Sequence, residues 1–188
     1  MSELSTKLLT IFQNVNDWLR FAEAKNAALL AFSGTAMTAI LTVLITAQGL
    51  PNSLRIGLLI STIFLNSCTL LCALSFLPKT NLERLLWIRD KPYRKLKPTI
   101  TDNLYYFGDL QKYSSAELLE ALNKQYVNNS AILPYGKESN DIAIQIIINS
   151  SIASMKFYLF TYALYFLIIS IVTVPITMLI NFIVLRGI

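Results

Sequence analysis

Three long blocks of apolar residues dominate the chain. They cover residues 27–48, 54–77 and 157–185, and the single charged residue within them is Arg55. A helix crosses the hydrocarbon core of a bilayer with about 20 apolar residues, each adding about 1.5 Å. Buried helices of soluble proteins rarely keep an apolar run beyond about 14 residues. The pattern therefore predicts three transmembrane helices.

Residues 1–26, before the first block, show the alternation of an amphipathic helix. Leu4, Leu8, Ile11 and Val15 recur at helical spacing, and polar residues occupy the opposite face. We expect this helix to continue unbroken into the first span, because no Gly or Pro occurs before Gly34. It either lies on the inner leaflet or packs against the rest of the cytoplasmic part.

The region 78–156 contains shorter helical patterns. The capping box Ser114-x-x-Glu117 predicts a helix from about Ser115 to Asn128, and Thr80-x-x-Glu83 predicts a short helix at 81–89. A further helix begins near Ser139 or Asn140 and runs into the third block. The predicted fold is therefore all-α and integral to the membrane. Its three spans have cytoplasmic helical extensions that form one bundle, which makes 1–188 a single domain.

Charge predicts the orientation of the spans. Fourteen of the 16 Lys and Arg residues lie before the first block or between the second and third, and Arg55 and Arg186 are the exceptions. Loops rich in Lys and Arg stay in the cytoplasm. We therefore expect the N-terminus and the central region to be cytoplasmic and the C-terminus to lie outside.

Composition argues against several kinds of catalysis. The chain contains no histidine, the commonest general base and metal ligand. Its two cysteines, Cys68 and Cys72, share one face of the second span, where packing is their ordinary role. No nucleophile–base pair or ligand cluster is visible. We therefore predict no catalytic residue, no metal site, no cofactor and no enzymatic activity. A transporter is also disfavoured, because no charged residue lies deep in a span.

Two features of the spans each have two interpretations. The small residues of the first span form either an oligomerisation face or a surface that packs on the other two spans. They are Ala27, Ala31, Thr35 and Ala39. Asn66, near the middle of the second span, either hydrogen-bonds another helix or lines a pore.

The cytoplasmic part holds two groups of polar residues. The basic residues around Arg94 and Lys95 interact either with anionic lipid headgroups or with a phosphorylated ligand, and nucleic acid is a poorer fit. Asp141, Gln145 and Asn149 form one stripe on an otherwise apolar helix. Such a stripe meets either polar groups of the first helix, such as Glu23 and Lys25, or a ligand.

Three short segments resemble one known family, the bacterial Pycsar-type transmembrane effectors. Trp18–Ala27 is similar to the segment leading into that family's first span, with Glu23 where Asp is usual and Asn26 where Ala is usual. Tyr106-Phe107-Gly108-Asp109 resembles the family's aromatic-Phe-Gly-Asp element. Asp141-x-x-x-Gln145, followed by Asn149 and Lys156, resembles its last cytoplasmic helix. The order and spacing of the three also match.

The resemblance implies a role in antiphage defence at the bacterial inner membrane. A partner cyclase would make a cyclic nucleotide upon infection, and the effector, acting as a homo-oligomer, would respond by disrupting the bilayer. Pycsar systems use cyclic pyrimidine mononucleotides, and related CBASS systems use cyclic oligonucleotides with membrane effectors of similar layout. The alternative is a non-gated membrane scaffold or anchor for a partner protein.

The resemblance and the charge pattern together predict a set of ligand-binding residues. Positive charge and hydrogen-bond donors would hold the phosphate, aromatic rings would stack on the base, and amides would read its edge. The candidates are Glu23, Lys25, Arg94, Lys95, Tyr106, Phe107, Asp141, Gln145, Asn149 and Lys156.

Overall fold

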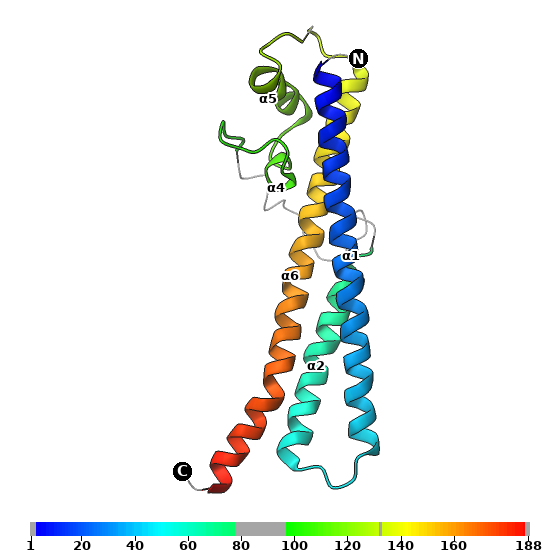
Figure 1. Ribbon diagram of the computed structural model, residues 1–188, viewed down its shortest axis with the longest axis vertical. Helices are drawn as coiled ribbons and strands as arrows, with labels where there is room; N and C mark the ends of the chain where they lie inside the picture. The colour runs from blue at the N-terminus through cyan, green and yellow to red at the C-terminus, as the bar shows by residue number, and fades with distance from the viewer. Residues whose placement is uncertain (1–2, 78–96, 132, 187–188) are drawn as a thin grey trace. The chain divides into compact units, whose positions relative to one another are not determined.

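Five helices make up the regular structure of the described residues, which are 3–77, 97–131 and 133–186 of the computed structural model (Figure 1). They are α1 (Glu3–Thr46), α2 (Asn52–Leu74), α4 (Phe107–Leu110), α5 (Ser115–Tyr126) and α6 (Lys137–Arg186). The described residues form no strand. The predicted helix at 81–89, together with Arg94 and Lys95, lies outside this part of the chain.

Three of these helices confirm the predicted membrane fold. α1, α2 and α6 are long and apolar enough to cross a bilayer. α1 is unbroken over 44 residues, so the amphipathic segment does continue into the first span. α6 begins at Lys137, slightly earlier than expected, and continues through Pro175. Gly49, with φ of 76°, lies in the short turn between α1 and α2, where a side chain would strain the backbone.

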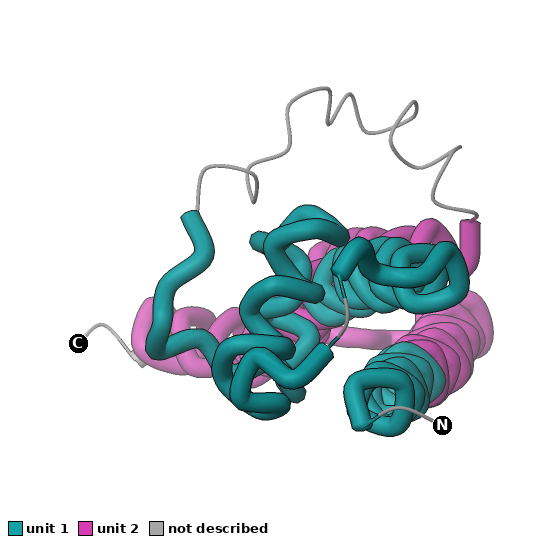
Figure 2. Tube along the Cα trace, turned by 90° about the horizontal axis from the view of Figure 1, so that it is seen from above, with its two compact units in different colours: residues 1–22, 78–157 teal, residues 23–77, 158–188 magenta. Residues whose placement is uncertain are grey.

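The chain forms two compact units, coloured separately in Figure 2. Unit 1 comprises residues 1–22 and 78–157, and unit 2 comprises residues 23–77 and 158–188. The boundaries fall inside α1 and inside α6, so each of these helices contributes to both units. That the whole chain acts as one domain stays a prediction.

Unit 1 has a core of aliphatic side chains and one tyrosine. The first part of α1 packs there with α4, α5, their flanking residues and the first part of α6. The buried residues are Leu4, Leu8, Ile11, Val15, Leu104, Leu110, Tyr113, Leu118, Leu119, Leu122, Val127, Ala143 and Ile146. The predicted capping box of Ser114 and Glu117 starts α5. The helix ends at Tyr126, before the predicted Asn128, because Asn128 and Asn129 adopt positive φ angles of 48° and 58°.

Unit 2 is a three-helix arrangement with small residues at its contacts. α2 faces α6 through the buried pair Ser61 and Ser170, whose hydroxyl oxygens lie 2.6 Å apart. α2 also faces α1, where the Thr69 hydroxyl donates to Ser33 Oγ at 3.0 Å. The buried apolar residues are few: Leu29, Leu65, Cys68, Cys72, Ala163 and Leu167. Most large apolar side chains of this unit therefore point outward, as lipid contact requires.

Candidate ligand-binding site

Five aromatic side chains of unit 1 form a continuous cluster, here called the aromatic cluster: Trp18, Phe21, Tyr106, Phe107 and Phe157. The rings of Phe107 and Phe157 stack, with centroids 5.1 Å apart and planes 14° apart. Trp18 contacts both, at 5.5 Å from Phe107 and 6.1 Å from Phe157. Phe21 lies against Trp18 and Phe157, and Tyr106 against Phe107. Residues from α1, α6 and the segment that begins α4 thus share one packed aromatic surface.

The cluster has a buried base and an exposed face. Phe107 is buried, whereas Trp18, Tyr106 and Phe21 are 39%, 43% and 47% exposed. A shallow depression of about 350 Å³ runs along the same face of α1 and is lined by Asn14, Asp17, Trp18 and Phe21. Exposed rings held by a buried one offer a preorganised surface for a flat, aromatic ligand.

Gly108 leaves room for the ring of Tyr106. A Cβ atom at Gly108 would collide with the Tyr106 ring, so the close approach of ring and backbone requires glycine. Phe107 begins the short helix α4, and its side chain is anchored against Trp18 and Phe157. The aromatic-Phe-Gly sequence therefore positions one exposed ring beside one buried ring.

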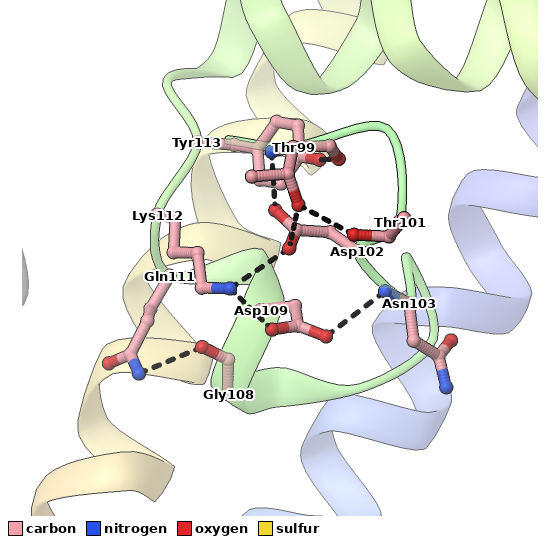
Figure 3. Close-up of polar contacts among 9 residues, drawn as sticks. All are labelled: Thr99, Thr101, Asp102, Asn103, Gly108, Asp109, Gln111, Lys112 and Tyr113. Atoms are coloured by element: carbon pink, nitrogen blue, oxygen red, sulfur yellow. Dashed lines mark hydrogen bonds and ion pairs between the residues drawn. The ribbon is translucent and has the colours of Figure 1, made fainter. Parts of the chain in front are cut away.

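An ion-pair network braces the loop that carries these rings (Figure 3). The Lys112 ammonium lies 2.9 Å from Asp102 Oδ1 and 2.6 Å from Asp109 Oδ1. Asp102 also accepts hydrogen bonds from the backbone and the hydroxyl of Thr99, and Asp109 accepts one from the backbone N–H of Asn103. The aspartate of the Tyr-Phe-Gly-Asp element is thus a structural brace.

Asp102 and Lys112 of the brace, and the neighbouring Tyr113, have shifted pKa values. Burial alone would raise the pKa of Asp102, but the Thr99 hydrogen bonds and the Lys112 ammonium outweigh it and lower the pKa to about 2. Asp109 and Asp102 raise the pKa of Lys112. Burial, followed by the nearby Asp102 carboxylate, raises the pKa of Tyr113 to about 12. At neutral pH Asp102 is therefore an anion and Lys112 a cation, and the two form an ion pair.

The polar stripe of α6 faces solvent at two of its residues and contacts α1 at the third. Asp141 and Gln145 are exposed, and Asn149 is half-buried. The Asn149 amide donates to Asn16 Oδ1 of α1 at 2.8 Å. Asn149 of the stripe thus meets a polar group of the first helix, Asn16.

The other nominated residues occupy different surroundings. Lys156 is 9% exposed, so a ligand in solution reaches it only if its neighbours move. Glu23 and Lys25 belong to unit 2, where the Lys25 ammonium lies 5.4 Å from the centroid of the Phe160 ring. Of the ten candidates, the structure brings Tyr106 and Phe107 into the aromatic cluster. Among the described residues no group of His, Cys, Asp and Glu could hold a metal ion.

Sequence reasoning missed three of the five aromatic residues as site residues. Trp18 and Phe21 follow each other on one face of α1, and Phe157 directly follows Lys156 at the end of unit 1. Their aromatic side chains are a signal visible in the sequence. That they meet Phe107 depends on how α1, α4 and α6 pack, which periodicity does not report.

The small-residue stripe of α1 and Asn66 of α2, each with two interpretations from the sequence, are both exposed. Ala27, Ala31, Thr35 and Ala39 are all exposed, so this stripe is not covered by the other two spans. Asn66 is also exposed on α2, and its side chain makes no hydrogen bond within the described ranges. Neither feature is accounted for by packing within unit 2.

The aromatic-Phe-Gly-Asp element and the three apolar helices agree with one known family. The sequence matches the Pycsar effector protein domain, PycTM, over residues 7–183. The chain belongs to the Pycsar effector family. It is 30% identical over 147 residues to the Pycsar effector protein RsPycTM of a Rhizobium species, and the alignment covers 78% of each chain. No solved structure matches the chain.

Family membership confirms the resemblance carried by the three short segments. The chain is a Pycsar effector of antiphage defence, and its three apolar helices make it a membrane protein. The Pycsar effectors are not a known enzyme family.

Proposed function

We propose that this Pycsar effector binds a cyclic nucleotide on the exposed face of the aromatic cluster and then disrupts the inner membrane. The observation that carries the proposal is the pair of partly exposed rings, Trp18 and Tyr106, held in place by the buried ring of Phe107. A base that stacks on an aromatic side chain gains about 1–3 kcal/mol. Both rings are already partly exposed, so a base can reach them.

Polar groups beside the rings suit the remainder of a nucleotide. Asn14 lines the depression next to Trp18, and its amide can pair with a base edge. The Arg20 guanidinium lies 3.8 Å from Asp17, and both side chains are more than 70% exposed, so this weak pair leaves Arg20 available to a phosphate. Arg94 and Lys95, nominated from the sequence, would add positive charge. Gln145 and Asp141 remain exposed candidates on α6.

The membrane response follows from the helices that leave unit 1. α1 and α6 are continuous from unit 1 into unit 2, so binding that favours one arrangement of their first parts biases the spans. The N-terminus and central region lie in the cytoplasm and the C-terminus outside, in accord with the distribution of Lys and Arg. Several copies act together, with no enzymatic step.

A binding titration tests the proposal. The variant Trp87→Phe leaves Trp18 as the single tryptophan, and its fluorescence should change when a cyclic pyrimidine mononucleotide is added to protein in nanodiscs. Tyr106→Ala should weaken binding roughly tenfold, the loss of about one stacking contact. Tyr165→Ala, which removes an exposed ring of unit 2, is the matched control and should leave the affinity unchanged.

A leakage assay tests the second half of the proposal. The same nucleotide should release a trapped dye from liposomes that contain the protein, and Tyr106→Ala should shift the required concentration by the same factor. If cyclic oligonucleotides alone give the response, the signal is of the CBASS kind. If no cyclic nucleotide binds or releases dye, the scaffold alternative replaces the proposal.

A further inference from the structure

Asn66 occupies an unusual place on α2. It follows the start of the helix at Asn52 by 14 residues, about 21 Å along the axis, and precedes Leu74 by eight. It therefore lies well inside a hydrocarbon core about 30 Å thick. The buried face of α2 consists of Gly57, Ser61, Leu65, Cys68 and Cys72, and Asn66 is on the opposite, exposed side.

Five threonines of the spans hydrogen-bond to the backbone of their own helix. The hydroxyls of Thr35, Thr38, Thr42, Thr46 and Thr173 each donate to the carbonyl oxygen four residues earlier. An asparagine amide has two N–H donors and an acceptor oxygen, and its own helix does not satisfy them. In the part of the chain that the structure describes, Asn66 has no side-chain partner. Facing lipid, its amide would be left unpaired where water is absent.

The neighbours of Asn66 describe the surface that covers it. Ile56, Leu59, Ile63 and Leu70 are 54%, 49%, 66% and 58% exposed, and with Asn66 and Ala73 they recur at alternating spacings of three and four. Lipid contact alone explains the apolar members, because the outer face of any packed helix recurs in this way. It does not explain Asn66, which needs a donor and an acceptor at the same depth.

We propose that this face of α2, called the Asn66 face and formed by Leu59, Ile63, Asn66 and Leu70, binds the same face of a second copy of the chain. A side-chain amide complements itself, since the carbonyl of one accepts from the amino group of the other. Two identical faces related by a two-fold axis place Asn66 opposite Asn66. The apolar residues on either side pack together and exclude lipid.

The proposal deepens the oligomeric step of the proposed function and rests on it. It identifies α2, not the small-residue stripe of α1, as the contact between copies. Thr35, the polar member of that stripe, is already hydrogen-bonded within its own helix, whereas Asn66 requires a partner from outside the chain.

Cysteine cross-linking in liposomes without nucleotide tests this contact. In a Cys68→Ala, Cys72→Ala background, single cysteines replace Leu59, Ile63 or Leu70. The matched controls are cysteines at Ile45 of α1 and Ile168 of α6, both exposed. Oxidation should link dimers several-fold faster on the Asn66 face, because a disulfide needs Cα atoms within about 7 Å. Equal rates at face and control positions would overturn the proposal.

Substitution of Asn66 separates the amide from the apolar face. Asn66→Leu should weaken association roughly tenfold, and Asn66→Gln, which keeps an amide, should restore most of it. Unchanged cross-linking in Asn66→Leu would contradict the proposal. If nucleotide still causes dye leakage when the Asn66 contact is absent, the contact is wrong but the proposed function is supported. If the Asn66 face cross-links but nucleotide causes no leakage, the contact is supported and the proposed function is wrong.

Discussion

The two units of this effector use opposite strategies for burying side chains. Unit 1 packs leucine, isoleucine and valine from several segments into one core. Its partly buried charged groups form ion pairs, as in the Asp102–Lys112–Asp109 brace. Unit 2 buries small residues and hydroxyls and leaves Ile45, 82% exposed, and Ile63, 66% exposed, on its outside.

The difference follows from the solvent that each unit is built for. In water, apolar burial stabilises a core by roughly 25 cal/mol per Å². In lipid that force between helices disappears, and close packing and hydrogen bonds hold them together. The same amino acids therefore contribute differently to the stability of the two units. Buried leucines stabilise the core of unit 1, whereas buried glycines and serines stabilise unit 2 by allowing its helices to pack closely.

The largest expected effect comes from the core of unit 1. Leu122 is fully buried, so Leu122→Ala should lower the free energy of unfolding by about 3 kcal/mol, from lost burial and the cavity left behind. Trp18 fluorescence in a Trp87→Phe background reports this in a denaturant titration. Ile45→Ala in unit 2 is the control and should cost under about 0.5 kcal/mol. Equal losses would break the comparison.

The brace of unit 1 gives the next largest effect. Lys112→Met removes the cation between Asp102 and Asp109 and leaves two mostly buried carboxylates without their partner. We expect a loss of about 2–3 kcal/mol in the same titration. Lys124→Met, at the exposed end of α5, serves as the control and should change stability by only about 0.3 kcal/mol. A small loss for Lys112→Met would mean that the network is only a surface feature.

Acid should weaken unit 1 through Asp102. Its pKa in the folded chain is lowered from 3.8 to about 2, so its stabilisation is present above the unfolded pKa. It is lost as the pH falls from about 4 to about 2. Unfolding titrations at several pH values should show this decline by Trp18 fluorescence. Asp102→Asn should be less stable at neutral pH and should lack this part of the decline.

Helix contact in unit 2 gives the smallest effect. A Cβ atom at Gly57 would collide with the Thr177 hydroxyl of α6, whereas Gly34 has no atom within 4 Å of that position. Gly57→Ala should cost about 1–2 kcal/mol by pushing α2 from α6. Gly34→Ala should be neutral or slightly stabilising. Thiol labelling of the buried Cys68 and Cys72 during thermal unfolding measures both. Equal behaviour would show that α2 and α6 are loosely packed.

The candidate site was only partly accessible to sequence reasoning. Tyr106 and Phe107 were nominated from a short motif, and both belong to the aromatic cluster. Trp18, Phe21 and Phe157 were not, because long separations along the chain hide which rings they contact. Asp141 and Gln145 were nominated from a helical stripe, but the packing of α6 leaves them exposed.

Local signals in the sequence were enough to define the helices and the solvent around them. Long apolar blocks, the Ser114 capping box and the absence of helix breakers before Gly34 act over a few helical turns. Only packing in three dimensions settled which side chains meet. It joined five distant aromatic residues in unit 1, paired Asn149 with Asn16, and turned Asn66 outward from unit 2. A periodic pattern shows which face of a helix is apolar or polar. It does not show which other helix packs against that face, because that depends on the tertiary structure.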